Sequence, residues 1–200
     1  MGGLKMIIRK FHRRNLPHLY NDGTYFITYR LAGTIPLHIL EKFQLELSKS
    51  GKENLVVRKK RIFKKYDEYL DKSLHGDNYL KKKEFAEIVK HTLHYPDGKD
   101  YFLICYCIMP NHVHLVFELL KVNKGVSKIM QSIKRISGLK CNKLLNKKGK
   151  FWQDESFDRL IRDDVELYHI VNYVINNPVK AGLIDDWQKW ENTYLAEEYR

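Results

Sequence analysis

Two apolar runs separated by a two-residue turn signal constrain the fold of this chain most strongly. Tyr101–Met109 and His112–Leu119 consist mainly of aliphatic and aromatic side chains, and Pro110-Asn111 lies between them. Runs of this length and composition predict strands, and proline followed by asparagine is typical of a tight turn. The sequence therefore predicts a hairpin of two strands. At nine residues, the longer run is far below the roughly 20 that a membrane helix needs, so we expect no membrane partner.

Strand and helix patterns alternate along the rest of the chain. Thr24–Leu31 predicts another strand, and Val56–Leu70 is basic and ambiguous. Helical spacing of apolar residues predicts helices over Leu37–Leu47, Lys81–Leu93, Ser127–Leu145 and Asp163–Asn176, with a loop over Ser73–Asn78 and irregular chain over Gly149–Arg162. Asp163 and Glu166 have the spacing of a helix N-cap and its capping-box partner. We expect one α+β domain over residues 1–200, with a largely antiparallel sheet and an acidic C-terminal extension at 184–200.

Charge predicts an acidic partner, most simply nucleic acid. Lysine and arginine number 36 against 24 acidic residues, which gives a net charge of +12. The stretch 121–150 holds ten basic residues and no acidic one, and further basic clusters lie at 9–14 and 58–65. Candidate DNA contacts are Arg13, Arg14, Lys124, Lys128, Lys134, Arg135 and, for stacking on unpaired bases, Trp152. Packing in the core is an equally good reading of Trp152.

A histidine pair begins the second strand of the hairpin. In His112-Val113-His114, strand alternation places both imidazoles on one face, where they could hold one metal ion. If Pro110-Asn111 is a two-residue turn, Cys107 opposes His114 on the same face. A structural zinc site that includes Cys105 and Cys107 is therefore one alternative, although Cys-x-Cys is not the usual zinc spacing. Buried free cysteines acting as small apolar residues are the other.

The last predicted helix carries a polar stripe that could lie over this strand. Glu166, His169, Tyr173 and Asn177 are spaced 3, 4 and 4 residues apart and therefore share one face. The adjoining apolar side must pack on the sheet. The default interpretation of any one of the thirteen tyrosines, Tyr173 included, is a residue at the rim of the core with a hydrogen-bonded hydroxyl.

Three segments together resemble a known family. They are Met109–Leu115, Phe151–Gln153, and the run from Tyr173 through Asn177-Pro178-Val179-Lys180-Ala181-Gly182 to Leu183. In this order they resemble the REP-associated tyrosine transposases, which are single-tyrosine HUH (His-hydrophobic-His) enzymes related to small insertion-sequence transposases. The resemblance also takes in residues 13–18 and 25–31. It covers most of the chain, and Val56–Asp77 is the least familiar part.

The resemblance implies a ferredoxin-like α+β fold with both histidines on a central strand. It implies cleavage of single-stranded DNA beside hairpins through a 5′-phosphotyrosine intermediate. His112, His114 and Asn177 match the family's ligands for Mg²⁺ or Mn²⁺, and Tyr173 matches its nucleophile. Such a protein is expected in the bacterial cytoplasm near the nucleoid, as a monomer or homodimer. Two alternatives stay open: a basic nucleic-acid-binding module with structural zinc, and a domesticated transposase that binds DNA without cleaving it.

Overall fold

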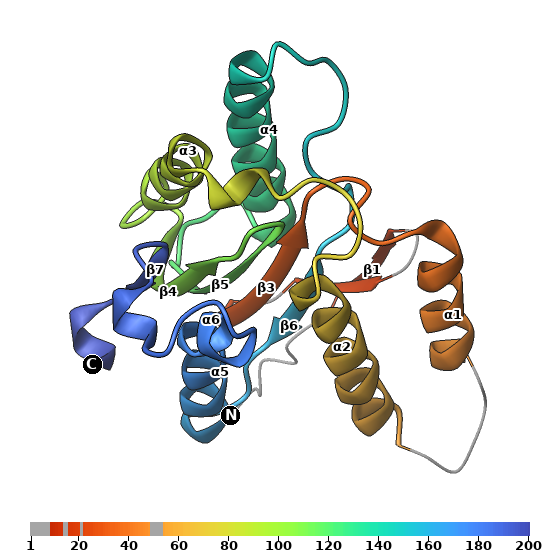
Figure 1. The fold of residues 1–200 in the computed structure, drawn as a ribbon. Helices are drawn as coiled ribbons and strands as arrows, with labels where there is room; N and C mark the ends of the chain where they lie inside the picture. The colour runs from red at the N-terminus through yellow and green to blue at the C-terminus, as the bar shows by residue number, and fades with distance from the viewer. Residues whose placement is uncertain (1–8, 14–15, 21, 49–53) are drawn as a thin grey trace, which may run out of the picture.

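A five-stranded antiparallel sheet forms the centre of the computed structural model, which describes residues 9–13, 16–20, 22–48 and 54–200 (Figure 1). Its strand order is β6-β3-β5-β4-β7. The strands are β3 (Thr24–Arg30), β4 (Tyr101–Ile108), β5 (His112–Leu119), β6 (Phe157–Leu160) and β7 (Thr193–Leu195), while β1 (Arg9–Arg13) and β2 (Leu16–Tyr20) form a separate hairpin. The strand that carries both histidines is therefore the central one, as predicted.

Helices cover both faces of this sheet (Figure 1). They are α1 (Leu37–Ser48), α2 (Leu55–Asp71), α3 (Lys83–His94), α4 (Val126–Leu144), α5 (Asp164–Ile175) and α6 (Asn177–Lys180), with short 3₁₀ turns at Tyr79–Lys81, Trp187–Lys189 and Glu197–Tyr199. The side chains of α3 and α4 pack on one face of the sheet, together with Ile27 and Tyr29. Those of α5 pack on the other face, with Phe26. These two apolar layers confirm the predicted α+β class.

Strand alternation explains which layer each residue joins. The buried strand β3 sends Ile27 toward α3 and α4, whereas Phe26 and Thr28 point the opposite way. Thr28 pairs with His114 and Tyr29 pairs with Val113 across β3 and β5. The two histidines therefore lie on the α5 side of the sheet.

Helix α5 begins as its sequence predicts. The side chain of Asp163 accepts a hydrogen bond from the backbone N–H of Glu166 (2.8 Å), and the Glu166 carboxylate accepts one from the N–H of Arg162. These contacts satisfy N–H groups that no turn of the helix can reach. Helix α5 ends at Ile175, and Asn176 separates it from α6. Pro178 lies in the first turn of α6, where its missing N–H costs nothing.

Three segments have regular structure that the sequence did not predict. The ambiguous basic segment is the 17-residue helix α2, and the segment predicted to be irregular contains the edge strand β6. The acidic extension contributes β7, which pairs with β4, and Trp190 donates a hydrogen bond to the carbonyl of Ile108 (3.1 Å). A strand of three or four residues is too short to show a clear alternation of apolar and polar residues. Its conformation depends mainly on the neighbouring strand with which it pairs. No helix in the described part of the chain has the length and apolar character needed to cross a bilayer.

Candidate metal and tyrosine site

His112 and His114 lie side by side on β5 and are fully buried. Their Nε2 atoms are 3.1 Å apart. The turn at Pro110-Asn111 has the predicted register, because Cys107 pairs with His114 across the hairpin. The expectation that both imidazoles share one face of the sheet is confirmed.

Neighbouring side chains fix the orientation of each imidazole. The Nδ1 of His112 lies 2.6 Å from the Asn111 amide oxygen, whose amide nitrogen in turn donates to the carbonyl of Leu70 (3.1 Å). Because an amide oxygen only accepts hydrogen bonds, Nδ1 of His112 carries the proton and Nε2 carries a lone pair. Nδ1 of His114 pairs with the hydroxyl of Thr28 (2.8 Å). Outer contacts of this kind are typical of metal-ligating histidines.

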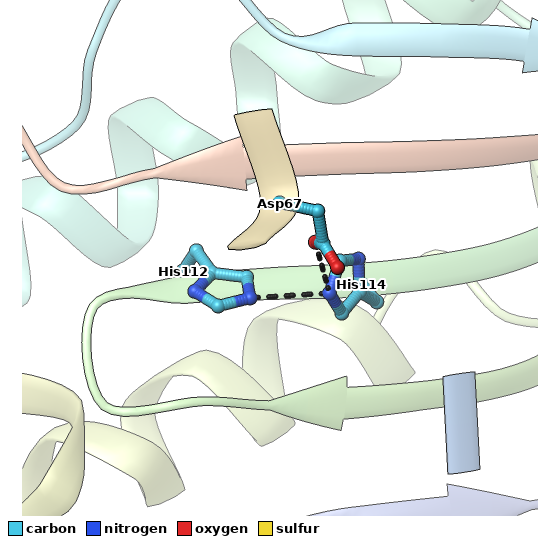
Figure 2. Close-up of side chains that lie close together, drawn as sticks. All are labelled: Asp67, His112 and His114. Atoms are coloured by element: carbon cyan, nitrogen blue, oxygen red, sulfur yellow. Dashed lines mark hydrogen bonds and ion pairs between the residues drawn. The ribbon is translucent and has the colours of Figure 1, made fainter. Parts of the chain in front are cut away.

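Asp67 from α2 completes a group that could hold a metal ion (Figure 2). Its Oδ1 lies 3.2 Å from Nε2 of His114, and the ligand atoms of Asp67, His112 and His114 all lie within 4.8 Å of one another. Burial raises the pKa of Asp67, but His114, His112 and a nearby lysine outweigh it and hold that pKa well below its usual range. Burial and His114 lower the pKa of His112 to about 3. An ionised carboxylate therefore faces a neutral imidazole, which suits a divalent cation.

Tyr173 on α5 reaches the same carboxylate. Its phenol donates a hydrogen bond to Oδ2 of Asp67, and its ring centroid lies 5.6 Å from that of His114. The rings of Phe26 and Phe63 pack against it, with centroids 6.1 Å away in each case. Burial and the neighbouring Asp67 raise the pKa of Tyr173 far above its ordinary value, so the phenol is held protonated. The structure thus brings the predicted nucleophile beside the predicted histidine pair.

Lys180 closes the site from α6. Its Nζ lies 2.9 Å from Oδ2 of Asp67 and 3.1 Å from Oδ2 of Asp71, and it lies over the Tyr173 ring at 5.2 Å. Oδ1 of Asp71 is 3.9 Å from Nε2 of His112. Burial and Asp67 raise the pKa of Asp71. No sequence pattern predicted a role for Lys180, although it lies within the Asn-Pro-Val-Lys-Ala-Gly motif.

Asn177, the predicted third ligand, is fully buried at the start of α6. Within the described part of the chain, neither its amide oxygen nor its amide nitrogen has a hydrogen-bond partner. A buried amide without partners costs about 1–3 kcal/mol and is rare unless the group binds something else. The Asn177 amide is therefore available to bind another group, and its role as the third metal ligand stays a prediction.

The cysteines behave as buried apolar residues. Cys105 and Cys107 are fully buried in the layer between the sheet and α5. Burial raises the pKa of Cys107 to about 12, which opposes the thiolate that zinc requires. Among the described residues, the candidate metal group contains no cysteine. The geometry favours the reading of these residues as free buried thiols over the structural-zinc alternative.

The candidate DNA contacts from the basic stretch lie on and beside α4, which packs on the other face of the sheet from Tyr173. Lys128 and Arg135 are exposed, and exposed Lys124 pairs with Asp100 (3.1 Å). Lys134 differs, because its ammonium donates to the carbonyls of Gln153, Asp154 and Glu155 at 3.1, 3.1 and 3.3 Å. Burial lowers the pKa of Lys134 to about 8. Lys134 therefore stabilises the backbone that follows Trp152, and its ammonium is not free to bind a phosphate.

Trp152 is 5% exposed, and its indole N–H donates to the hydroxyl of Ser137 (2.9 Å). Its ring packs against Tyr29 with centroids 4.7 Å apart. The structure therefore supports the core reading of Trp152, because a base could stack on this ring only if the core opened. Of the other proposed contacts, Arg14 lies outside the described residues, and only the backbone of Arg13 is described.

Three comparisons with known proteins agree with this geometry. The family model described as "Transposase IS200 like" matches residues 58–177, which is more than half of the chain. A protein of Haemophilus influenzae named as a REP-associated tyrosine transposase is 27% identical over 117 residues, covering 54% of this chain and 64% of the relative. The match therefore spans less than two thirds of that relative's length.

A solved structure has the same fold over most of the chain. It is that of a REP-associated tyrosine transposase bound to a REP hairpin, with a TM-score of 0.58, 17% sequence identity, and coverage of 92% of this chain and 81% of the other. At this identity the likeness concerns the fold. The extent of the family match identifies the chain itself: it belongs to the IS200-like transposase family.

Proposed function

We propose that this chain cleaves and rejoins single-stranded DNA beside hairpins, with Tyr173 as the nucleophile. Membership of a transposase family implies a DNA-cleaving enzyme. The observation that carries the proposal is the hydrogen bond from the Tyr173 phenol to Asp67, whose other oxygen lies 3.2 Å from His114. A phenol placed against a candidate metal group is what a tyrosine nucleophile requires, and a protein that only binds DNA has no need of it.

The donor set suits Mg²⁺ or Mn²⁺. His112 and His114 would supply Nε2 atoms and Asp67 a carboxylate oxygen, while the unsatisfied amide of Asn177 offers a further oxygen. When bound, such a cation polarises the scissile phosphate and stabilises the negative charge that develops on it. Asn111 and Thr28 hold the imidazoles in place for this role.

Each side chain then has a defined part in the reaction. Asp67 holds the phenol oxygen of Tyr173 beside the histidines and offers an acceptor for its proton. Attack by that oxygen forms the Tyr173–phosphorus bond and breaks the bond to the 3′ oxygen, which leaves as a hydroxyl after taking up a proton. Lys180, which touches Asp67 and overlies the Tyr173 ring, supplies positive charge where the phosphate would lie. A 3′-hydroxyl from another strand can reverse the step, so joining needs no ATP.

Hairpin DNA is the proposed substrate, because a protein of the same fold has been solved with a REP hairpin and a curated relative bears the REP-associated name. The basic surface of α4 supports a DNA partner. Action on chromosomal DNA would place the protein in the bacterial cytoplasm, at the nucleoid, as a monomer or homodimer.

The second candidate is a domesticated protein of this fold that binds hairpins without cutting them. Incubation of the protein with labelled single strands that flank a hairpin, in the presence of Mg²⁺ or Mn²⁺, separates the two functions. We expect a shortened strand and a covalent protein–DNA band in a denaturing gel. Stable binding with neither product would favour the second candidate.

A further inference from the structure

The site that contains Tyr173 needs its own cations to hold a DNA strand. The basic stretch at 121–150 contributes the surface of α4, which covers the opposite face of the sheet from α5. A strand bound only there would have to pass around the sheet to reach Tyr173. The second basic cluster in the sequence, at 58–65, lies instead on α2, the helix that carries Asp67 into the site (Figure 1).

Helical spacing aligns two lysines of α2 with the site. Lys60, Lys64, Asp67 and Asp71 are spaced 4, 3 and 4 residues apart, so they form one stripe along the helix. The two carboxylates at its C-terminal end both contact Lys180, and Asp67 also contacts Tyr173. From Asp67, Lys64 lies about 4.5 Å and Lys60 about 10.5 Å further along the helix axis. The stripe therefore leads away from the site in steps comparable with the separation of phosphates on an extended strand.

Other basic residues of α2 have structural partners on a different side of the helix. Nζ of Lys65 lies 2.8 Å from the Glu46 carboxylate on α1, and buried Arg58 donates to the carbonyl of Leu47 (3.4 Å). These contacts attach α1 to α2. They account for part of the basic cluster without any DNA.

Among the residues that the structure describes, neither Lys60 nor Lys64 makes a contact of this kind with α1. Both are exposed, and the side chain of Lys64 is 75% exposed. Its ion pair with Glu68, at 3.9 Å between two exposed groups, is of a kind worth little in water. A phosphate can replace such a partner at small cost.

We infer that Lys60 and Lys64 bind successive phosphates of the single strand that flanks the scissile phosphate. The inference rests on the proposed function for the identity of the site, and it adds the path by which the strand leaves it. Lys180 marks the end of this path at Tyr173, and Lys64 and Lys60 follow outward along α2. The partner is a single DNA strand, recognised through its phosphates and without regard to base sequence.

The test compares two double variants, one within α2 and one that combines a residue of α2 with a residue of the turn directly after it. Lys60→Ala/Lys64→Ala removes the stripe, whereas Lys65→Ala/Lys72→Ala removes the same charge from exposed positions off the stripe. Binding of fluorescent oligothymidylate is measured by anisotropy over a range of KCl concentrations. Because each phosphate contact contributes about 0.7 to the salt dependence for single strands, we expect the stripe variant to lower the slope by about 1.4. The off-stripe variant should lower it by less than half of that amount.

A charge-retaining variant, Lys60→Arg/Lys64→Arg, should restore the slope and the affinity. Equal slopes for the stripe and off-stripe variants, or no change in either, would overturn the inference. Circular dichroism of each variant confirms that it folds. Every protein used for binding also carries Tyr173→Phe, so the DNA is not cleaved during the measurement. A failure of the proposed function, seen as absent cleavage by the wild-type chain, is therefore distinguishable from a failure of this inference.

Discussion

The phenol of Tyr173 donates a hydrogen bond to the carboxylate of Asp67, a residue 106 positions earlier in the chain. The same carboxylate lies against His114 on β5 and Lys180 on α6. Asp67 therefore joins the predicted nucleophile to the predicted metal ligands. It comes from α2, the segment least familiar in sequence, and no residue-type pattern marked it.

Asp67 should be needed for metal binding as well as for the placement of Tyr173. We expect Asp67→Ala to weaken Mn²⁺ binding by more than the roughly 10- to 100-fold that loss of an outer-shell partner costs. Titration followed by Mn²⁺ electron paramagnetic resonance measures this without any reaction. His114→Ala should have a similar effect, and EDTA should stop cleavage until Mg²⁺ or Mn²⁺ is restored. Unchanged Mn²⁺ affinity in Asp67→Ala would remove this residue from the ligand set.

Acid should destabilise the protein in the presence of a chelator over the window set by His112. Folding lowers the pKa of His112 from its ordinary value of about 6.5 to about 3. Between these two pH values the imidazole is protonated in the unfolded chain and neutral in the folded chain. The free energy of unfolding should therefore fall as the pH falls through this window. The depressed pKa of Asp67 acts in the same direction, since its contribution is present above about pH 3.9 and is lost below it.

Urea denaturation midpoints measured from pH 7 to pH 4 check this dependence, and His112→Asn should flatten it. His38→Asn, at an exposed position of α1, provides the matched control and should leave the dependence intact. A wild-type midpoint that does not change with pH would show that His112 is protonated in the folded protein.

Lys134 should affect stability more than DNA binding. Its ammonium satisfies three backbone carbonyls, so Lys134→Met should lower the free energy of unfolding by about 1–3 kcal/mol. The adjacent exposed Arg135→Ala should leave stability within about 0.5 kcal/mol, as for ordinary surface changes, while weakening the binding of hairpin DNA at low salt. Thermal denaturation and anisotropy on both variants separate the two roles. If Lys134→Met instead weakened DNA binding and left stability unchanged, Lys134 would be a DNA contact as first predicted.

The sequence predicted those parts of the fold that depend on neighbouring residues within one helix or strand. Strand alternation was enough to place His112 and His114 together, and the side chain of Asp163 was sufficient to mark the start of α5. The proximity of Tyr173 to the histidines also followed, because the apolar side of α5 had to pack on the sheet. Each of these inferences needs only the periodicity of one element and the face that it buries.

Asp67 could not be predicted in the same way. Basic residues interrupt the apolar pattern of α2, and its contacts with Tyr173 and His114 depend on how a distant helix packs on the sheet. Lys134 and Trp152 were assigned to DNA because charge and aromatic character are visible in sequence, whereas the carbonyls and hydroxyl that engage them are not. The strand β7 was missed because three residues at a sheet edge take their structure from β4.

The most direct measurement is peptide mapping of the covalent DNA adduct in wild type and in Tyr173→Phe. This substitution removes one oxygen and almost no volume, so the fold and DNA binding should be retained, although loss of the hydrogen bond to Asp67 should lower the free energy of unfolding by about 1–3 kcal/mol. We expect the wild-type adduct to map to the peptide containing Tyr173, and the variant to form neither adduct nor cleaved strand. An adduct that persists in Tyr173→Phe, or that maps to another tyrosine, would contradict the assignment of Tyr173 as the nucleophile.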